Sequence, residues 1–300
     1  MDTQALWILD GGMGRELARR GAPFRQPEWS ALALMEAPET VREVHRAYVA
    51  SGARVITTNS YALVPFHIGE ARFAAEGERL AALAGQLARE VADEQPGRMQ
   101  VAGSLPPLFG SYRADLFDAG RVSELATPLI RALSPHVELW LAETMSLIAE
   151  PLAIQALLPE DGKPFWVSFT LEDEAPGSEP TLRSGERVAD AACALASAGV
   201  DAILFNCCQP EVIEGALKVA RAGLQALGRS DVRLGAYANA FPPQPKEATA
   251  NDGLDEIRTD LGPLDYLGWA ERWRAAGASL IGGCCGIGPE HIEALASRLR

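Results

Sequence analysis

The sequence predicts an α/β protein folded as a (β/α)8 TIM barrel, and two observations support this prediction. Short apolar runs alternate along the 300 residues with longer stretches in which apolar residues have helical spacing. Such alternation predicts parallel strands, because each crossover needs a long connection that covers the sheet. Eight strand–helix units in a chain of this length suit a closed barrel. A doubly wound open sheet is the alternative, and we expect a single domain over residues 1–300.

Each apolar run has the length and composition of a buried strand. In chain order the runs are LWILD (6–10), RVITT (54–58), QVAGS (100–104), VELWLAE (137–143), FWVSF (165–169), AILFN (202–206), VRLGAY (232–237) and SLIGG (279–283). Three of them follow a small residue and a glycine, in SGARVI, AGVDAI and AGASLI. A glycine at this point is typical of the left-handed cap that ends a helix before a strand begins.

Helices are predicted between the strands, where apolar residues recur every three or four positions. This spacing occurs at Val41, Val44, Tyr48 and Val49, and again along EVIEGALKVARAGLQAL (211–227). Two stretches rich in proline and glycine, 173–180 and 241–253, predict long loops. Neither has the length or bias of a domain linker.

The charge balance excludes some classes of partner. Lysine and arginine number 27 and aspartate and glutamate 40, a net charge of −13. This excess argues against a nucleic-acid or anionic-membrane surface. The N-terminus has no basic segment followed by an apolar core, and no apolar run is long enough to span a membrane. We therefore expect a cytoplasmic protein, monomer or homodimer, that acts on small molecules.

Polar residues gather where the predicted strands end, which is where a TIM barrel places its active site. These ends carry Asp10-Gly11-Gly12, Thr57 to Tyr61, Gly103-Ser104, Glu143-Thr144, Asn206-Cys207-Cys208, Tyr237, Asn239 and Gly282 to Gly286. Cys207 and Cys284 lie far apart in the sequence, but they are predicted to lie at the same mouth of the barrel.

The cysteines suggest a metal site. The five are Cys193, Cys207, Cys208, Cys284 and Cys285. Adjacent cysteines are poorly placed for a disulfide, because bridge geometry is hard to reach across one peptide bond. Three thiolates with a fourth position left open are typical of a catalytic zinc, whereas a structural site closes with four protein ligands. The alternative is that the thiols are buried as small hydrophobic side chains.

Four motifs, LDGGMG (9–14), AET (142–144), NCC (206–208) and GGCCG (282–286), resemble the homocysteine S-methyltransferase family. Members are zinc-dependent (β/α)8 barrels that methylate homocysteine to methionine. The resemblance covers essentially the whole chain in the right order. It implies that Cys207, Cys284 and Cys285 hold Zn²⁺ and that Cys208 is a neighbour rather than a ligand.

The resemblance also implies roles for other residues at the mouth. Glu143 matches the glutamate that clamps the substrate amine, and Asp10, with the backbone of Gly11, matches a position that helps to bind the amino acid. We expect Glu143 and Asp10 to be the catalytic carboxylates, and Asn59 and Tyr61 to line the same pocket. The alternatives are that Asp10 caps the following helix and that Glu143 is a structural carboxylate.

The methyl donor is expected to be a sulfonium. The chain ends soon after GGCCG, which resembles the compact branch that uses S-methylmethionine. A sulfonium leaves as a neutral thioether and needs no acid, which agrees with the scarcity of histidine at the mouth. Two departures from the family pattern flank the donor pocket, GSLPPLFGSYR (103–113) and YAN (237–239). They leave the choice between S-methylmethionine and S-adenosylmethionine open.

Two other functions remain open at this stage. The acceptor could be selenocysteine or another small thiol in place of homocysteine. The protein could instead be a non-catalytic sensor whose zinc or thiols respond to oxidation.

Overall fold

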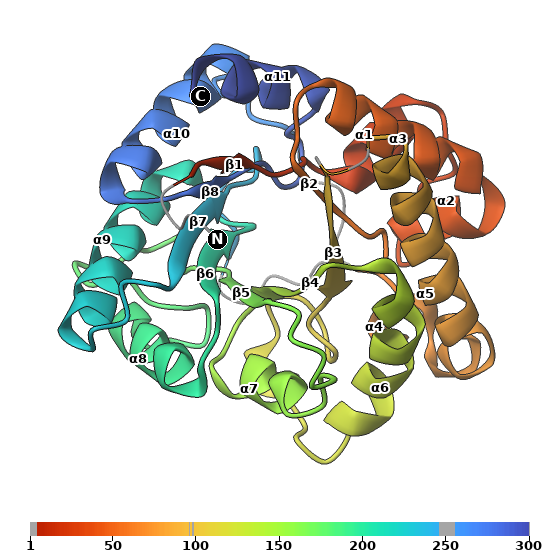
Figure 1. Ribbon diagram of the computed structural model, residues 1–300, viewed down its shortest axis with the longest axis horizontal. Helices are drawn as coiled ribbons and strands as arrows, with labels where there is room; N and C mark the ends of the chain where they lie inside the picture. The colour runs from red at the N-terminus through yellow and green to blue at the C-terminus, as the bar shows by residue number, and fades with distance from the viewer. Residues whose placement is uncertain (1–4, 96, 98, 246–255, 300) are drawn as a thin grey trace.

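The computed structural model describes residues 5–95, 97, 99–245 and 256–299, which form a ring of parallel strands inside a ring of helices (Figure 1). The strands are β1 (Trp7–Ile8), β2 (Val55–Thr57), β3 (Gln100–Leu105), β4 (Leu139–Met145), β5 (Phe165–Phe169), β6 (Ala202–Asn206), β7 (Arg233–Tyr237) and β8 (Leu280–Ile281). All eight predicted strands are present.

The sheet closes on itself between its first two strands. From β2 to β8 each strand is the neighbour of the next along the chain, and β8 pairs with β1. The remaining gap is bridged where Leu9 pairs with Val55, flanked by hydrogen bonds from Asp10 N to Val55 O (3.0 Å) and from Arg54 N to Ile8 O (2.7 Å). The predicted TIM barrel is therefore confirmed, and the open-sheet alternative is wrong.

The outer ring contains eleven α-helices within the described residues. They are α1 (Met13–Arg19), α2 (Ser30–Glu36), α3 (Pro38–Ala50), α4 (Pro65–Ile68), α5 (Glu70–Asp93), α6 (Val122–Leu133), α7 (Ala149–Gln155), α8 (Val188–Ala198), α9 (Pro210–Ala226), α10 (Pro263–Ala276) and α11 (Pro289–Arg298). Two short 3-10 helices are η1 (Ala114–Leu116) and η2 (Ser134–His136). The helices predicted from periodicity correspond to α3 and α9. The predicted cap glycines Gly52, Gly199 and Gly277 have φ values of 97°, 84° and 109°.

The inside of the barrel is filled rather than open. Successive residues of a strand point to opposite faces, so every second residue of β4 points inward. Leu139 and Leu141 belong to a buried cluster with residues from the other strands, such as Trp166, and Cys284 packs against it. Trp140 instead joins the larger core between the strands and the helices. The site at the mouth therefore rests on a packed floor.

The two predicted loops differ in how far they are described. Residues 173–180 contain neither helix nor strand. They lie within a hairpin that is closed by a β-bridge between Leu171 and Leu182. Residues 241–245 are irregular, and the remainder of the second loop, 246–253, lies outside the described residues. No helix in the described part of the chain combines the length and the apolar character needed to span a membrane.

A buried carboxyl away from the mouth makes the stability of the fold depend on pH. Glu150 on α7 is 3% exposed, and its Oε1 accepts a hydrogen bond from Leu108 N at 2.8 Å. Burial raises its pKa from 4.5 to about 7. The folded protein therefore keeps this proton after the unfolded chain has lost it, and the stabilisation present below pH 4.5 is lost as the pH rises through 7.

We expect Glu150→Gln to be more stable than the parent above pH 7, by about 2–3 kcal/mol, because the amide keeps the acceptor without the charge. At pH 5 most of this advantage should be absent. Unfolding by urea at pH 5 and pH 8.5 measures both values. An equal difference at the two pH values would show that the carboxylate is not the cause.

Candidate metal centre and amino-acid pocket

Three of the five cysteines meet at the mouth of the barrel. Cys207 directly follows β6, and Cys284 and Cys285 follow β8. The Sγ atoms of Cys207 and Cys284 are 3.1 Å apart, and those of all three cysteines lie within 4.8 Å of one another. All three thiols are free. Zinc bound tetrahedrally to sulfur at about 2.3 Å separates its ligands by about 3.8 Å, so the cluster has the right size and chemistry for one such ion.

The backbone turns Cys207 and its neighbour Cys208 in different directions. Cys207 has φ 53°, a left-handed backbone conformation that residues other than glycine adopt only when their surroundings hold them there. Its carbonyl accepts hydrogen bonds from Thr170 Oγ1 at 3.2 Å and from the Tyr112 hydroxyl at 3.4 Å. Cys208 is fully buried and packs in the core between strands and helices. Cys207 therefore lines the cavity, whereas Cys208 does not.

Close packing of two loops brings Cys284 and Cys285 to the same point. A Cβ on Gly12 would lie 2.5 Å from the carbonyl oxygen of Cys284, so only glycine allows the β1 loop to pass this close. Gly286 has φ 84° and turns the chain back after the cysteine pair. The glycines in both motifs therefore serve the approach of the two loops.

The three thiols influence each other's ionisation. Hydrogen bonds with Cys207 and Cys284 lower the pKa of Cys285 well below that of an ordinary thiol. A hydrogen bond with Cys207, together with burial, raises the pKa of Cys284. The cluster thus favours the loss of one proton, and further ionisation calls for a positive charge among the sulfurs.

Two carboxyl groups face the same cavity. Asp10 is 7% exposed, and its carboxylate accepts hydrogen bonds from Thr57 N at 2.7 Å and Thr57 Oγ1 at 3.1 Å. Helix α1 begins two residues after Gly11, with Gly12 as its N-cap and no side-chain capping bond. The alternative that Asp10 caps this helix is therefore wrong. Glu143 accepts hydrogen bonds from Ser104 Oγ and, at 3.5 Å, from the Tyr237 hydroxyl.

Both carboxyls are poised to receive a cation. Burial, with a smaller contribution from the charge of Glu143, raises the pKa of Asp10 to about 7 against the hydrogen bonds from Thr57. Burial likewise raises the pKa of Glu143 to about 7. Among the described residues, no lysine, arginine or histidine forms an ion pair with either group. An ammonium group entering the cavity would lower both pKa values and pair with the carboxylates.

The side-chain amide of Asn206 links β4, which carries Glu143, to the end of β6, which Cys207 follows. Its Oδ1 accepts hydrogen bonds from Thr144 N (3.1 Å) and Ser168 Oγ (2.6 Å), and its Nδ2 donates to Thr144 Oγ1 at 2.8 Å. The pairing of β4 with β5 is irregular here, and Thr144 has φ 60°. Asn206 therefore fixes the position of Thr144 on β4 and of Cys207, the next residue in the sequence.

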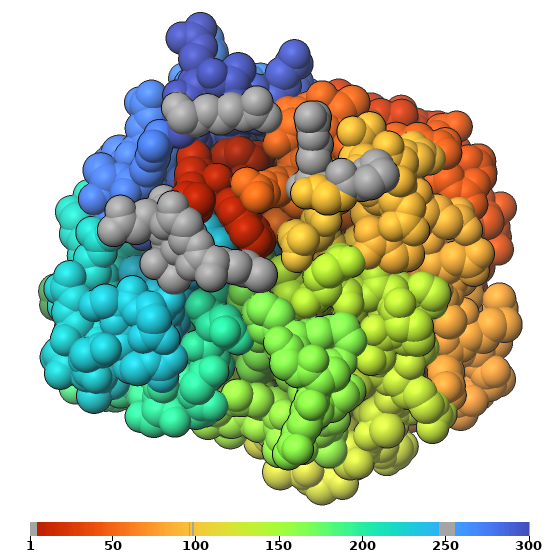
Figure 2. All heavy atoms as spheres, in the orientation of Figure 1, coloured from red at the N-terminus to blue at the C-terminus, as the bar shows by residue number. Residues whose placement is uncertain are grey.

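The cavity at the mouth contains every predicted site residue. Figure 2 shows the hollow near the centre of one face, where red N-terminal atoms lie beside orange and yellow-green ones. Asp10, Gly11, Asn59, Tyr61, Glu143, Cys207, Cys284 and Cys285 all line it. Asn59 Nδ2 donates to Ser30 O at 3.1 Å, and Tyr61 hydrogen-bonds Ser111 at 2.5 Å.

Several lining residues were missed by the sequence analysis. They are Arg15, Trp29, Tyr112, Phe241 and Gln244, among others. Trp29 lies between α1 and α2 in a segment with no periodic signal, and Tyr112 lies in the segment 103–113, which the resemblance placed beside the donor pocket without singling out this residue. Arg15 lies shortly after Asp10 in the sequence LDGGMGRE. It could have been predicted as a lining residue, because the first turn after a barrel strand faces the mouth.

Comparison with known proteins agrees with this geometry. The sequence profile of the homocysteine S-methyltransferase family matches residues 7–299. The homocysteine S-methyltransferase of Escherichia coli is 33% identical over 99% of this chain and 96% of its own length. The chain belongs to the homocysteine S-methyltransferase family.

Members of the family resemble the chain in structure as well as in sequence. The metallated form of the homocysteine methyltransferase MmuM from E. coli superposes with a TM-score of 0.77 at 31% identity, covering 99% of this chain and 97% of that one. A selenocysteine Se-methyltransferase from Brassica oleracea var. italica is 28% identical over 99% of this chain and 90% of its own. The family is thus a group of methyltransferases with more than one named acceptor.

Proposed function

We propose that the protein transfers a methyl group from a sulfonium donor to the thiolate of L-homocysteine, giving methionine, with zinc as cofactor. The observation that carries the proposal is the meeting of three cysteine thiols and two carboxyls, those of Asp10 and Glu143, in one cavity. The thiols suit a metal that binds the substrate sulfur, and the carboxyls suit the substrate ammonium. We further propose that residues 1–300 act as one domain.

The zinc ligands in this proposal are Cys207, Cys284 and Cys285. Bound zinc would act as a Lewis acid that keeps the substrate sulfur deprotonated, while three thiolates keep that sulfur electron-rich. The chain's own contribution is to hold the three sulfurs in place, through the strained backbone of Cys207 and the close approach of Gly12 to Cys284. Asn206 fixes Cys207 relative to Glu143.

The amino-acid end of homocysteine would lie beside Glu143 and Asp10. Each carboxylate has hydrogen bonds that hold its orientation, from Ser104 and Thr57 respectively, and neither is paired with a cation in the described part of the chain. Asn59 Oδ1 is buried without a hydrogen-bond partner among the described residues. It is a suitable acceptor for a further ammonium hydrogen.

The methyl step is a displacement in line with the breaking bond. A lone pair of the homocysteine sulfur forms the new S–CH₃ bond, and the electron pair of the broken C–S⁺ bond stays on the donor sulfur, which leaves as a neutral thioether. The thiol proton has already left when the substrate sulfur binds as the thiolate. No side chain needs to protonate the leaving group.

The charge at the mouth supports a donor with a carboxylate, such as S-methylmethionine or S-adenosylmethionine. Arg15 is the one lysine or arginine among the described residues that line the cavity, and its guanidinium carbon lies 5.3 Å from the centre of the Phe241 ring. The positive charge of Arg15 would attract the carboxylate of such a donor strongly in this partly enclosed site.

We expect the purified protein to hold one zinc per chain and to form methionine from homocysteine with S-methylmethionine or S-adenosylmethionine. Trimethylsulfonium, which lacks a carboxylate, should be used less well by about tenfold or more. Metal analysis and a donor panel measure both. If the zinc-loaded protein transfers no methyl group from any of the three, the proposed reaction is wrong.

Selenocysteine is the second candidate acceptor, because the Brassica relative carries that name. Homocysteine and selenocysteine competing for one labelled donor separate the two. A non-catalytic sensor would need no amino-acid pocket. Homocysteine binding that depends on Glu143 would therefore count against it.

A further inference from the structure

A fully buried ion pair lies beside the cavity without taking part in the proposed chemistry. The side chains of Asp173 and Arg183 are 1% and 2% exposed, and Arg183 Nη1 lies 3.1 Å from Asp173 Oδ1. Both belong to the hairpin between β5 and α8. A buried ion pair adds little to stability, because the cost of removing both charges from water offsets their attraction. Its presence here calls for another explanation.

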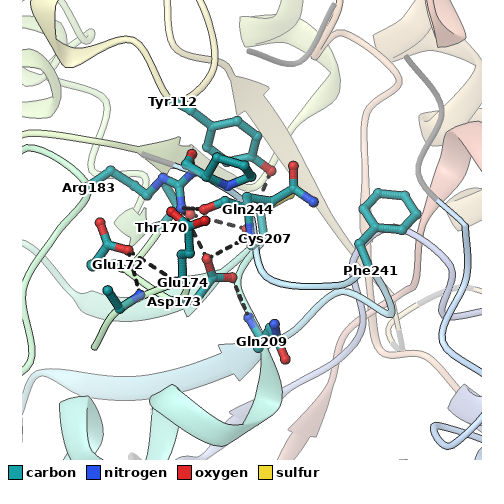
Figure 3. A network of polar contacts seen from close by, with 12 residues as sticks. Tyr112, Thr170, Glu172, Asp173, Glu174, Arg183, Cys207, Gln209, Phe241 and Gln244 are labelled. Atoms are coloured by element: carbon teal, nitrogen blue, oxygen red, sulfur yellow. Dashed lines mark hydrogen bonds and ion pairs between the residues drawn. The ribbon is translucent and has the colours of Figure 1, made fainter. Parts of the chain in front are cut away.

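The pair connects its hairpin to the segment that follows β7 (Figure 3). Arg183 donates to Gln244 O from Nη1 (3.0 Å) and to Pro245 O from Nη2 (2.9 Å). Asp173 Oδ1 accepts from Gln244 N at 3.1 Å, and Oδ2 accepts from Gln209 N at 3.1 Å. The guanidinium and the carboxylate thus hold both sides of one peptide segment, and the carboxylate also holds the start of α9.

The same guanidinium lies against an aromatic wall of the cavity. Its central carbon is 4.8 Å from the centre of the Tyr112 ring, and the Tyr112 hydroxyl donates to Cys207 O. Tyr112, Phe241 and Gln244 all line the cavity. We call these three residues the outer wall. Its members come from two loops far apart in the sequence, and Asp173 and Arg183 contact two of the three.

The outer wall and the two carboxyls assigned to the substrate amine come from different parts of the fold. Asp10 and Glu143 lie on the strand side, where Thr57 and Ser104 orient them. With the amino acid held there and its sulfur at the cysteines, the donor must approach from the remaining side for an in-line displacement. Aromatic faces such as those of Tyr112 and Phe241 attract a cationic sulfonium.

We propose that the Asp173–Arg183 pair is a positioning element that fixes the outer wall, and that this wall is the contact surface for the methyl donor. The proposal rests on the proposed function for the identity of the donor. Neither residue touches the reacting atoms. Their effect is to hold Gln244 and Tyr112 where a donor meets them.

The test compares three variants with the parent protein. Arg183→Lys keeps the charge but loses the planar guanidinium, which donates to the two carbonyls from two separate nitrogens. The double variant Asp173→Asn with Arg183→Met removes both charges together, so that no unpaired charge stays buried. Arg187→Met is the matched control, because Arg187 lies on the same hairpin and pairs with Glu179 at the surface, where the two side chains are 55% and 51% exposed.

We expect the double variant to raise the KM for S-methylmethionine by about tenfold, with Arg183→Lys intermediate and Arg187→Met unchanged. Zinc content and the KM for homocysteine should stay within about twofold of the parent, since Cys207 keeps its hydrogen bond from Thr170 Oγ1 and the carboxylates of Asp10 and Glu143 are held by other contacts. Hydrogen exchange of the Gln244 amide, which donates to Asp173, should accelerate in the double variant but not in the control, as should that of Phe241, the other non-proline residue of 241–245.

The outcomes separate this proposal from the proposed function. If the parent uses no sulfonium, the proposed reaction fails, and equilibrium binding of S-methylmethionine with hydrogen exchange still decides whether the pair positions a donor surface. Unchanged exchange in residues 241–245, or an unchanged KM for the donor in the folded double variant, overturns the proposal. So does a matching rise in the KM for homocysteine, which would indicate a general structural role.

Discussion

Replacing Cys284 by serine should abolish stable zinc binding and lower methyl transfer by about a thousandfold or more, because a neutral hydroxyl does not replace a thiolate ligand. The Sγ atoms of Cys207 and Cys284 are 3.1 Å apart, so the loss of either sulfur opens the cluster. Cys207→Ser and Cys285→Ser should behave alike. Zinc content per chain and the rate of methionine formation measure the effect.

Two other cysteines provide matched controls for this experiment. Cys193 lies on α8 outside the cluster, and Cys193→Ser should keep both zinc and activity. Cys208 is next to a ligand in the sequence but packs in the core. Cys208→Ala should keep zinc and lose only stability, by about 1–2 kcal/mol. Loss of zinc in Cys208→Ala with retention in Cys207→Ser would contradict the assignment.

Replacing Glu143 by glutamine should raise the KM for homocysteine by about 10- to 100-fold, since a hydrogen bond between two charged groups is worth about 1.5–3 kcal/mol. Glutamine keeps the size of the side chain and an oxygen to accept from Ser104 Oγ or the Tyr237 hydroxyl. It removes only the negative charge that would pair with the substrate ammonium. Zinc content should be unchanged.

The effect of Glu143→Gln can be told apart from a general loss of stability. Glu150 is another glutamate whose pKa is raised to about 7, but it lies on α7 and does not line the cavity. Glu150→Gln should leave the KM for homocysteine unchanged. Equal effects of the two substitutions on this KM, or no effect of either, would show that Glu143 does not bind the substrate amine.

The residues predicted from the sequence at the cavity share one property: each follows a strand closely. Asp10, Glu143 and Cys207 lie within or just after β1, β4 and β6, and the carboxyl ends of parallel strands all meet at one mouth. Position along a strand is a local property, which apolar periodicity reveals. This is why residues far apart in the chain could be placed together without a structure.

The outer wall and its ion pair could not be predicted in this way. Asp173 and Arg183 lie in a stretch whose composition predicts only a loop, and Gln244 lies in another. Nothing local distinguishes these three from exposed polar residues. Their burial depends on how the two loops pack over the mouth, and contacts of this kind become defined only when the whole barrel is assembled.

The sequence by itself determined the barrel fold, the family and the three cysteines of the cluster. Both the spacing of apolar residues and the short glycine–cysteine motifs can be recognised in consecutive residues. Tertiary structure decided how the backbone turns Cys207 toward the cavity, through its φ of 53°. It also decided the pKa values near 7 at Asp10 and Glu143. Burial causes those shifts, and it is a property of the closed barrel rather than of the residues themselves.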